Sequence, residues 1–501
     1  MCRKWSDFCN ISWGDLTGRM KSPAKCVKIL KAEVRKETKA RIDTSARQRK
    51  QRTGKSRRPG GEGERRMHAV IMAGGKGTRL AEITKGEIPK PMAPVLGKPL
   101  LLWQTERLKE AGITRVTMIV GHLREKIMEY FGDGSRFGLE VDYIEETEPL
   151  GTAGAFYYLK EKMQDPYFLL LFGDVFFDID IARMEKFFLE KNAAAALFAH
   201  PNAHPFDSDL IRADKDGKVT AFDSKHNVRD YWYDNCVNAG IYLLRKEILD
   251  KVPAPVKTDF EKEILAPMAE RGEAVYAYCS PEYVKDVGTV DRIRKAEADL
   301  QSGFISRRNL KHRQKAVFLD RDGVINVLRG FIRREEEFEL LPGVTEALGR
   351  INSSEYLAIV VTNQPVIARG ETTFEELENI FNKMKTLLGR EGVYVDDLFF
   401  CPHHPDKGFP GERPEFKIDC SCRKPKTGLL EAAAEKYNIS LEDSWMIGDT
   451  TMDIECGRRG GLHTILVKTG SGGSDGKYDV TPDYVCEDLG AAVDVILKVR
   501  N

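Results

Sequence analysis

The sequence lacks the features that mark membrane proteins and secreted proteins. It contains no run of about 18 apolar residues that could span a bilayer. Only 10 of its 501 residues are cysteines, too few for the disulfide scaffold of a secreted domain. The first residues carry no apolar segment of the kind found in signal peptides. We therefore expect a cytoplasmic protein without a membrane partner.

The chain also lacks a large net charge, but its charges are unevenly distributed. The formal net charge is +1, yet residues 1–66 hold 20 Lys and Arg against 7 Asp and Glu. This basic segment has little that could build a core, so it predicts a disordered extension. A solvated extension or a misassigned start is favoured over nucleic-acid binding, because short charge patterns are weak signals.

What is present is the composition of globular domains, with 42% hydrophobic and 9% aromatic residues. Short apolar runs alternate with helical patterns over residues 67–300 and again over 315–501. This alternation predicts two α/β domains, the first with a largely parallel sheet. Residues 301–314 are polar and basic and predict a linker. Expected strands lie at 116–120, 167–172, 194–198, 240–244, 316–319, 358–361, 397–400, 444–447 and 464–467. Expected helices lie at 101–111, 181–191, 344–351, 374–388 and 427–437.

A glycine-rich loop follows the first apolar run of the first domain. Gly74, Gly75 and Gly77 allow the backbone to approach a phosphate and turn its N–H groups toward it. Arg79 and Lys90 supply positive charge for a triphosphate. The loop matches neither the dinucleotide-binding pattern nor the ATPase loop, so its interpretation depends on the segments that follow.

Five further segments occur in order: 88–95 (IPKPMAPV), 148–154 (EPLGTAG), 172–174 (FGD), 237–241 (VNAGI) and 286–289 (DVGT). With the loop they resemble the sugar-1-phosphate nucleotidyltransferases over residues 67–295, which implies a GT-A-like, Rossmann-like domain. The resemblance implies that the triphosphate is held by Gly74, Gly75, Gly77, Thr78, Arg79 and Lys90. It implies a base and sugar contact at Gly151, and Mg²⁺ on Asp174 and Asp286. It further implies a sugar-phosphate pocket that includes Lys225, Asn238 and Gly240. The family's Glu-Lys-Pro reads Ser-Lys-His around Lys225.

The second domain opens with two carboxylates just after an expected strand. Asp320 and Asp322 can direct one carboxylate at phosphorus while the other handles the leaving-group proton. With 360–363 (VVTN), 423–425 (RKP) and 448–453 (GDTTMD), they resemble the haloacid dehalogenase-like (HAD-like) phosphatases. The resemblance implies Asp320 as nucleophile and Asp322 as general acid and base. It implies phosphoryl contacts from Thr362 and Lys424, and substrate contacts from Asn363 and Arg423. Mg²⁺ is expected on Asp320, Asp449 and the backbone carbonyl of Asp322, with support from Asp453.

Three cysteines and one histidine form a metal-ligand set in this domain. Cys401, His403, Cys420 and Cys422 supply three thiolates and one imidazole, which is complete for a structural, tetrahedral Zn²⁺. Within the superfamily, residues 315–501 resemble the heptose 1,7-bisphosphate 7-phosphatases, whose relatives the histidinol phosphatases share this zinc loop. Three departures from the usual motifs lie at Leu328, Pro365–Val366 and Thr450.

The two resemblances together indicate consecutive reactions. A 7-phosphatase leaves heptose 1-phosphate, which a nucleotidyltransferase of this type activates; GTP and D-glycero-α-D-manno-heptose 1-phosphate are the expected substrates. Two alternatives stay open. The first is a mannose or glucose 1-phosphate transferase fused to a histidinol-phosphatase-like or other phosphatase. The second is a nucleic-acid-binding protein with one degenerate domain. The sequence allows a homo-oligomer and does not specify its subunit number.

Overall fold

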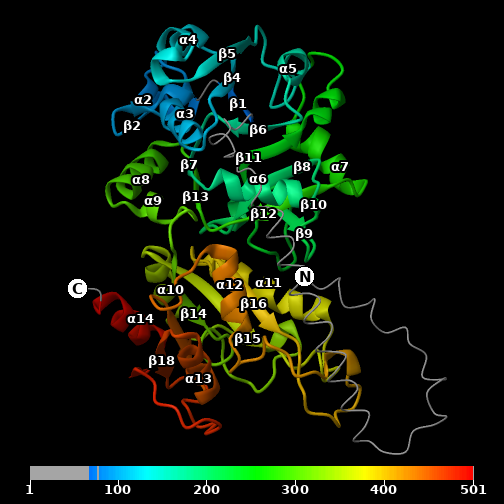
Figure 1. The fold of residues 1–501 in the computed structure, drawn as a ribbon, viewed down its shortest axis with the longest axis vertical. Coiled ribbons are helices and arrows are strands. Elements are labelled where there is room, and N and C mark those ends of the chain that lie inside the picture. Colours follow the sequence, from blue (N-terminus) through cyan, green and yellow to red (C-terminus); the bar gives the residue numbers. More distant parts are fainter. Residues whose placement is uncertain (1–66, 76–77, 500–501) are drawn as a thin grey trace, which may run out of the picture. The chain divides into compact units, whose positions relative to one another are not determined.

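Two sheets organise the part of the chain that the computed structural model describes, which is residues 67–75 and 78–499. The basic extension at 1–66 lies outside the described residues. In the first sheet the strands run in the order β10-β9-β11-β6-β1-β4-β5, with β8 beside β11 and β12 beside β8 (Figure 1). Its strands are β1 (His68–Ala73), β4 (Arg115–Val120), β5 (Glu140–Glu145), β6 (Tyr167–Phe172), β8 (Ala195–His200), β9 (Leu210–Ala213), β10 (Val219–Asp223), β11 (Val237–Arg245) and β12 (Val275–Cys279).

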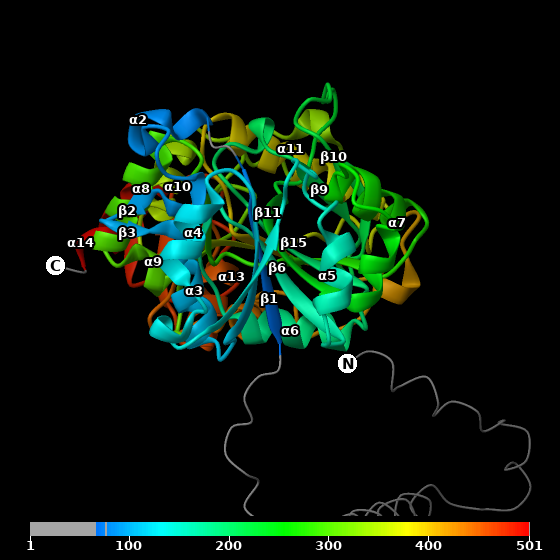
Figure 2. The same cartoon turned by 90° about the horizontal axis from the view of Figure 1, so that it is seen from above.

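The first sheet is mixed rather than largely parallel. β1 pairs in parallel with both β4 and β6, which flank it in the sheet. Figure 2 shows β1 beside β6. β11 instead runs antiparallel to β6 and β8. An apolar run reveals a buried strand but not its direction, so the sequence could not distinguish the two arrangements. The predicted α/β class is confirmed.

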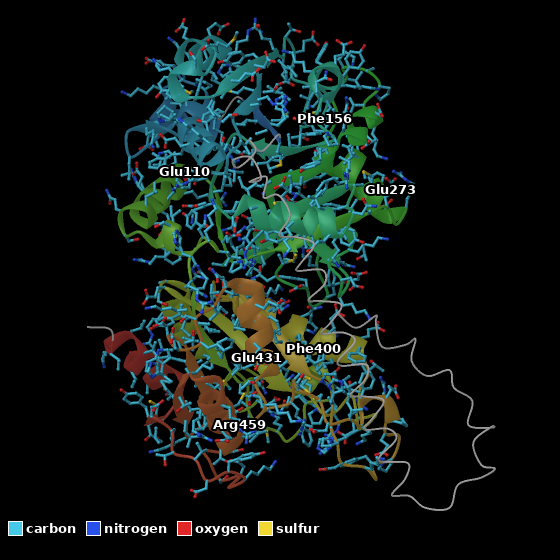
Figure 3. The ribbon with its side chains drawn as sticks, viewed as in Figure 1. Glu110, Phe156, Glu273, Phe400, Glu431 and Arg459 are labelled. Atoms are coloured by element: carbon cyan, nitrogen blue, oxygen red, sulfur yellow. The ribbon has the colours of Figure 1, made fainter. Side chains whose placement is uncertain are left out.

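Helices cover both faces of this sheet. The core on one face includes side chains of α3 (Leu100–Glu110), α4 (Arg124–Phe131) and α6 (Ile181–Glu190). The core on the other includes side chains of α5 (Phe156–Lys162), the π-helical turn η7 (Phe260–Leu265) and α7 (Ala266–Glu270). Phe156 is fully buried in this second core, whereas Glu110 lies on the surface (Figure 3).

Short elements complete the first domain and place residues near the ends of the central strands. They are η2 (Thr78–Leu80), α2 (Ala81–Thr84), η3 (Lys90–Met92), β2 (Pro94–Val95), β3 (Lys98–Pro99), η4 (Ser135–Phe137), β7 (Val175–Asp178), η5 (Pro205–Asp207), η6 (Lys246–Lys251), β13 (Tyr283–Asp286) and α8 (Val290–Gln301). β13 pairs antiparallel with β7, and this pairing sets Asp286 beside Val175.

The segment at 301–314, predicted to be a polar linker, is ordered, and part of it is buried. It contains α9 (Phe304–Arg307), and the side chains of Arg308 and Asn309 are enclosed. Arg308 pairs with Asp396 at 3.3 Å, and Asn309 donates to Oδ1 of Asp178 at 2.6 Å. Polar composition therefore did not mean exposure for Arg308 and Asn309, because each side chain bonds to a partner far along the chain.

The second sheet is parallel throughout, in the order β16-β15-β14-β17-β18-β19. Its strands are β14 (Lys315–Leu319), β15 (Tyr356–Asn363), β16 (Asp397–Cys401), β17 (Trp445–Gly448), β18 (His463–Val467) and β19 (Tyr484–Cys486). The helices are η8 (Glu335–Glu337), α10 (Val344–Asn352), α11 (Phe374–Arg390), η9 (Pro414–Phe416), α12 (Gly428–Tyr437), α13 (Thr451–Gly460) and α14 (Leu489–Lys498). In chain order the strands read 3-2-1-4-5-6, the doubly wound Rossmann order. In such sheets the ligand crevice lies at the carboxyl ends of the strands where the order reverses, here between β14 and β17.

Among the described residues, none of the helices combines the length and the apolar composition needed to cross a bilayer.

Candidate active sites

The nucleotide side of the first site begins where β1 ends. Gly74 lies against the side chain of Glu146, because a Cβ built on Gly74 would lie 2.4 Å from Oε2 of Glu146 and would displace that carboxylate. Gly77 lies outside the described residues, and of Thr78 only the backbone is described. A cavity of about 920 Å³ brings together most of the predicted nucleotide residues, namely Gly74, Gly75, Arg79, Lys90, Gly151 and Asp174. Such a volume suits a ligand of nucleotide size.

Two cations and two carboxylates meet beside this cavity. Lys90 forms an ion pair with Asp174. Around Gly288, a built Cβ would lie 2.7 Å from Oδ1 of Asp286, 3.1 Å from Nζ of Lys90 and 3.2 Å from Nη2 of Arg79. Oδ2 of Asp286 accepts from Arg292 at 2.5 Å, whereas Oδ1 is buried without a hydrogen-bond partner in the described structure. A buried, unpartnered carboxylate oxygen next to a second carboxylate fits the hard-oxygen ligand set that Mg²⁺ prefers.

The residues predicted to bind the sugar phosphate, Lys225, Asn238 and Gly240, line a second cavity of about 1180 Å³, called the sugar cavity for this prediction. Asp174 and Asp286 also line it. β11 contains an irregularity between Asn238 and Tyr242 where it pairs with β8. Gly240 lies inside this irregularity with a φ of +72°, a conformation that favours glycine. Asn238 and Gly240 therefore line this cavity from an irregular part of a central strand.

Motif reasoning missed two carboxylates at this site, Glu146 and Glu261. Glu146 lines the nucleotide cavity, and burial raises its pKa above the usual range. Glu261 lines the sugar cavity, and burial likewise raises its pKa. Neither belongs to a segment that carried the resemblance; only the neighbouring motif at 148–154 pointed to the region of Glu146.

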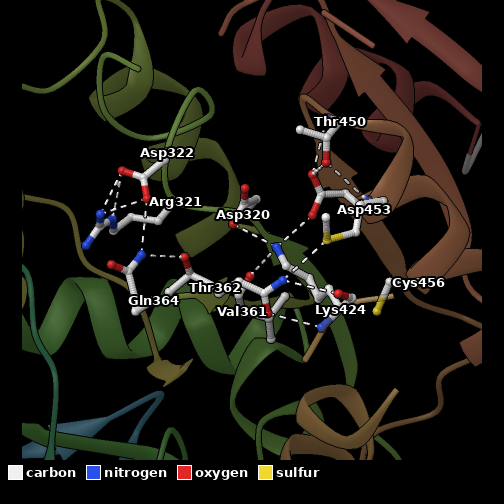
Figure 4. Close-up of polar contacts among 12 residues, drawn as sticks. Asp320, Arg321, Asp322, Val361, Thr362, Gln364, Lys424, Thr450, Asp453 and Cys456 are labelled. Atoms are coloured by element: carbon white, nitrogen blue, oxygen red, sulfur yellow. Dashed lines mark hydrogen bonds and ion pairs between the residues drawn. The ribbon is translucent and has the colours of Figure 1, made fainter. Parts of the chain in front are cut away.

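The second site occupies the crevice between β14 and β17. Asp320 follows β14, Thr362 lies near the end of β15, and Asp449 follows β17. Lys424 reaches this point from a loop and is almost fully buried. Its Nζ lies 2.7 Å from Oδ1 of Asp320, 2.6 Å from Oδ1 of Asp453 and 2.8 Å from the carbonyl of Val361 (Figure 4).

Three carboxylates crowd around that ammonium group. One oxygen each of Asp320, Asp449 and Asp453 lies within 4.8 Å of the others. Burial raises the pKa of Asp320 to about 7; Lys424 opposes this rise, and the neighbouring carboxylates add to it. Burial also raises the pKa of Asp449 to about 6. One lysine cannot neutralise three buried carboxylates, so this donor set fits a divalent cation bound by oxygen ligands.

Asp322 is held apart from the carboxylate cluster (Figure 4). Nη2 of Arg321 donates to both of its oxygens at 2.7 Å, Asn326 donates at 3.0 Å, and Gln364 donates at 3.1 Å. Gln364 also donates to Oγ1 of Thr362 at 2.9 Å. The orientation of Asp322 is therefore fixed, as a group that moves a proton at one atom requires.

The predicted substrate contacts Asn363 and Arg423 bond within the protein. Oδ1 of Asn363 accepts from the backbone of Lys424 at 3.0 Å, and its Nδ2 donates back to the carbonyl of Lys424 at 3.2 Å. Arg423 donates to the carbonyl of His403 at 3.1 Å. Both residues thereby hold the loop that presents Lys424.

The three departures from the usual motifs have different structural settings. Leu328 is partly exposed, whereas Pro365 and Val366 are buried. Thr450 is the N-cap of α13, where its side chain accepts from the backbone of Asp453. The threonine thus satisfies a helix terminus beside the cluster.

The four predicted zinc ligands converge at the carboxyl end of β16. The Sγ–Sγ distances are 3.5 Å for Cys401–Cys420, 3.2 Å for Cys401–Cys422 and 3.3 Å for Cys420–Cys422. Nδ1 of His403 lies 3.6 Å from Sγ of Cys401 and 3.3 Å from Sγ of Cys422. Tetrahedral zinc thiolates with bonds of about 2.3 Å have edges of roughly 3.8 Å, so the donor set fits a zinc ion with little adjustment.

Comparison with known proteins finds matches to two families along the chain. Residues 68–303 match the family model of the nucleotidyl transferases, and residues 421–492 match the HAD-hydrolase-like model. A mannose-1-phosphate guanylyltransferase of Mycobacterium tuberculosis is 30% identical over 239 residues, covering 48% of this chain and 66% of that enzyme. The crystal structure of HddC from Yersinia pseudotuberculosis complexed with GMP-PN is 26% identical, with a TM-score of 0.40, and covers 47% of this chain and 99% of that one.

The second domain matches known relatives over almost their whole length. The D-glycero-beta-D-manno-heptose-1,7-bisphosphate 7-phosphatase of Pasteurella multocida is 37% identical over 179 residues, covering 35% of this chain and 93% of that enzyme. The chain therefore belongs to the heptose-1,7-bisphosphate 7-phosphatase family through its second domain, which follows a nucleotidyl transferase domain in the same polypeptide.

Proposed function

We propose that this chain is a bifunctional enzyme that makes a nucleotide-activated heptose in two consecutive steps. The observation that carries the proposal is that one polypeptide holds both the Lys424-centred carboxylate cluster and the convergence of Arg79, Lys90 and Asp286. The first removes a phosphate from a sugar bisphosphate, and the second joins a nucleotide to a sugar 1-phosphate. The product of the first step is the substrate of the second.

In the phosphatase step, Asp320 attacks the phosphorus of the 7-phosphate and forms an aspartyl phosphate. Asp322 gives its proton to the departing sugar oxygen and then takes one from the water that hydrolyses the intermediate. Lys424 and Thr362 hold the phosphoryl oxygens. Mg²⁺, held by Asp320 and Asp449, would neutralise phosphoryl charge. The heptose 1-phosphate leaves with its anomeric phosphate intact.

In the transferase step, a phosphate oxygen of the sugar 1-phosphate attacks the α-phosphorus of the nucleoside triphosphate in line. The bond to the β-phosphate breaks, and pyrophosphate leaves. Arg79 and Lys90 neutralise the developing negative charge while the loop at Gly74 positions the triphosphate. Asp174 and Asp286 would hold a Mg²⁺ ion, which would supply positive charge to the phosphates.

Guanine is the base that the nucleotide cavity favours. Glu146 places a half-buried carboxylate in that cavity, and an ionised carboxylate only accepts hydrogen bonds. The pairing edge of guanine presents two adjacent donors, the ring N1–H and the 2-amino group, whereas that of uracil presents one. We therefore propose GTP as the nucleotide.

Zinc is proposed at Cys401, His403, Cys420 and Cys422, where it would fix the loop that ends at Lys424. All four positions are filled by protein ligands, so the ion has no open position for catalysis. The seven cysteines of the described residues are free thiols, as a metal-binding role in the reducing cytoplasm requires.

A second candidate substrate is mannose 1-phosphate. The M. tuberculosis relative of the first domain is a mannose-1-phosphate guanylyltransferase, so this sugar is the appropriate competitor. The test is incubation of the protein with either anomer of heptose 1,7-bisphosphate, or with mannose 1-phosphate, together with each NTP and Mg²⁺. Mass spectrometry should find GDP-heptose from the bisphosphate. GDP-mannose alone, with no phosphate released from either bisphosphate, would reject the heptose proposal.

A further inference from the structure

A half-buried carboxylate faces the sugar cavity with only half of its hydrogen-bonding capacity used. Oε1 of Glu261 accepts from the hydroxyl of Tyr242 at 2.6 Å and from Nδ2 of Asn238 at 2.7 Å. Oε2 accepts from none of the described residues, yet it is not sealed from solvent, and Glu261 lines the cavity. One oxygen therefore anchors the group, and the other remains free for a ligand.

The orientation of this carboxylate is fixed from two sides. Nδ2 of Asn238 also donates to the hydroxyl of Tyr242 at 2.9 Å, which closes a triangle of polar groups. Tyr242 is fully buried, and its ring packs edge-on against Phe260 with centroids 5.1 Å apart. The side chain of Asn238, predicted to contact the sugar phosphate, thus bonds to its neighbours and positions Glu261.

Hydrogen bonds connect the backbone around Glu261 to the loop at 151–154. Asp259 caps the turn by accepting from the backbone of Glu261 at 3.1 Å. The backbone of Phe260 donates to Oγ1 of Thr152 at 2.7 Å, and Thr258 pairs with Gly151. Glu261 therefore keeps a set position relative to the loop at 151–154, which is predicted to face base and sugar.

We propose that Oε2 of Glu261 accepts a hydrogen bond from a ring hydroxyl of the sugar 1-phosphate and thereby selects the sugar; this rests on the proposed transferase function. A carboxylate repels phosphate, so its ligand must be a neutral donor, and a sugar offers hydroxyls. The anionic end of the substrate is drawn instead toward the cations Arg79 and Lys90. A buried hydrogen bond to a charged acceptor discriminates strongly against an analogue that lacks the donor.

The test compares three full-length proteins in the transferase assay: wild type, Glu261→Gln and Glu270→Gln. Gln keeps the shape and an oxygen for Tyr242 and Asn238, but it removes the charge that faces the cavity. Glu270 is exposed at the end of α7, the helix that continues from η7, so its substitution is the matched control. We expect Glu261→Gln to raise the KM for heptose 1-phosphate about 10- to 100-fold and to leave the KM for GTP within twofold. Glu270→Gln should match wild type.

A second measurement separates contact with the sugar from a structural effect. Wild type is assayed with mannose 1-phosphate and with its analogues lacking the 2-, 3- or 4-hydroxyl. For wild type, kcat/KM with one deoxy analogue should be at least about 10-fold lower than with mannose 1-phosphate. This difference should shrink in Glu261→Gln, because the analogue and the variant remove the same hydrogen bond. An unchanged penalty for every analogue, or equal rises in both KM values, overturns the assignment of Glu261.

The outcomes distinguish this inference from the proposed function. If wild type turns over the sugar 1-phosphate and the KM values of Glu261→Gln are unchanged, the proposed role of Glu261 is rejected. The transferase function is then unaffected. Turnover of mannose 1-phosphate but not of heptose 1-phosphate rejects the heptose assignment. The KM values of wild type and Glu261→Gln for mannose 1-phosphate then decide the role of Glu261. Failure of wild type to turn over either sugar with any NTP rejects both.

Discussion

The ammonium group of Lys424 lies 2.7 Å from Oδ1 of Asp320, and both side chains are largely buried. The group proposed to attack phosphorus is thus held and partly neutralised before any substrate binds. Asp453 shares the same ammonium at 2.6 Å, so Lys424 fixes two of the three carboxylates in the cluster.

Replacing Asp320 with Asn should abolish phosphate release from heptose 1,7-bisphosphate by at least about 10³-fold, because the amide cannot form an aspartyl phosphate. Transfer from GTP to supplied heptose 1-phosphate should continue at the wild-type rate, since the two sites use different residues. Coupled phosphate detection and product mass spectrometry measure both activities in one preparation. Loss of both in a folded variant would contradict the assignment of separate sites.

Zinc should be present at one ion per chain in purified protein, measured by elemental analysis. Cys401→Ser should lose it and lower the melting temperature, because metal binding at such a site contributes folding free energy. Cys486→Ser is the matched control, since Cys486 is a buried thiol outside the cluster. A folded wild-type protein without zinc, or equal zinc in both variants, would reject the site.

Sequence motifs predicted well which residues lie close together where the motifs follow strand ends. Asp320 and Asp449 adjoin the point where the strand order reverses. Neighbouring parallel strands end at the same edge of the sheet, so the two carboxylates meet irrespective of the loop conformations. Prediction from the sequence failed for groups that reach a site only through tertiary contacts. Glu261 reaches the cavity only because β11 is distorted and η7 packs against it, and neither feature follows a local pattern. Arg308 resembled a linker residue because its partner Asp396 lies 88 positions away.

A buried carboxylate that takes no part in either proposed reaction should make stability depend on pH. Burial raises the pKa of Glu282 to about 7. Its Oε1 accepts from the backbones of Asp180 at 2.6 Å and Leu310 at 3.0 Å. Because the folded pKa exceeds the unfolded value of about 4.5, the folded state binds the proton more tightly. The stabilisation is complete below about pH 4.5 and is lost as pH rises through about 7.

Glu282→Gln should therefore flatten the fall in melting temperature between pH 5.5 and 8, while its amide oxygen keeps both backbone contacts. Asp320 and Asp449 titrate in the same window, so the difference between variant and wild type, measured by scanning fluorimetry in Mg²⁺, isolates Glu282. Glu270→Gln changes an exposed residue, so its melting temperature should depend on pH as that of wild type does. Parallel curves for Glu282→Gln and wild type would show that Glu282 is ionised throughout this range.

Glu146 provides the sharpest test of base selection. If its carboxylate accepts from the N1–H and 2-amino groups of guanine, ITP, which lacks that amino group, should be a poorer substrate than GTP for wild type. In Glu146→Gln, kcat/KM for GTP should fall about 10- to 100-fold, the range for a hydrogen bond to a charged group. The preference for GTP over ITP should shrink as well, because the amide offers one acceptor oxygen and one donor nitrogen in place of two acceptors. The KM for heptose 1-phosphate should stay within twofold, since Glu146 lines the nucleotide cavity and Glu261 the sugar cavity. Equal loss with GTP and ITP would mean that Glu146 supports the loop at Gly74, which it adjoins, and does not read the base.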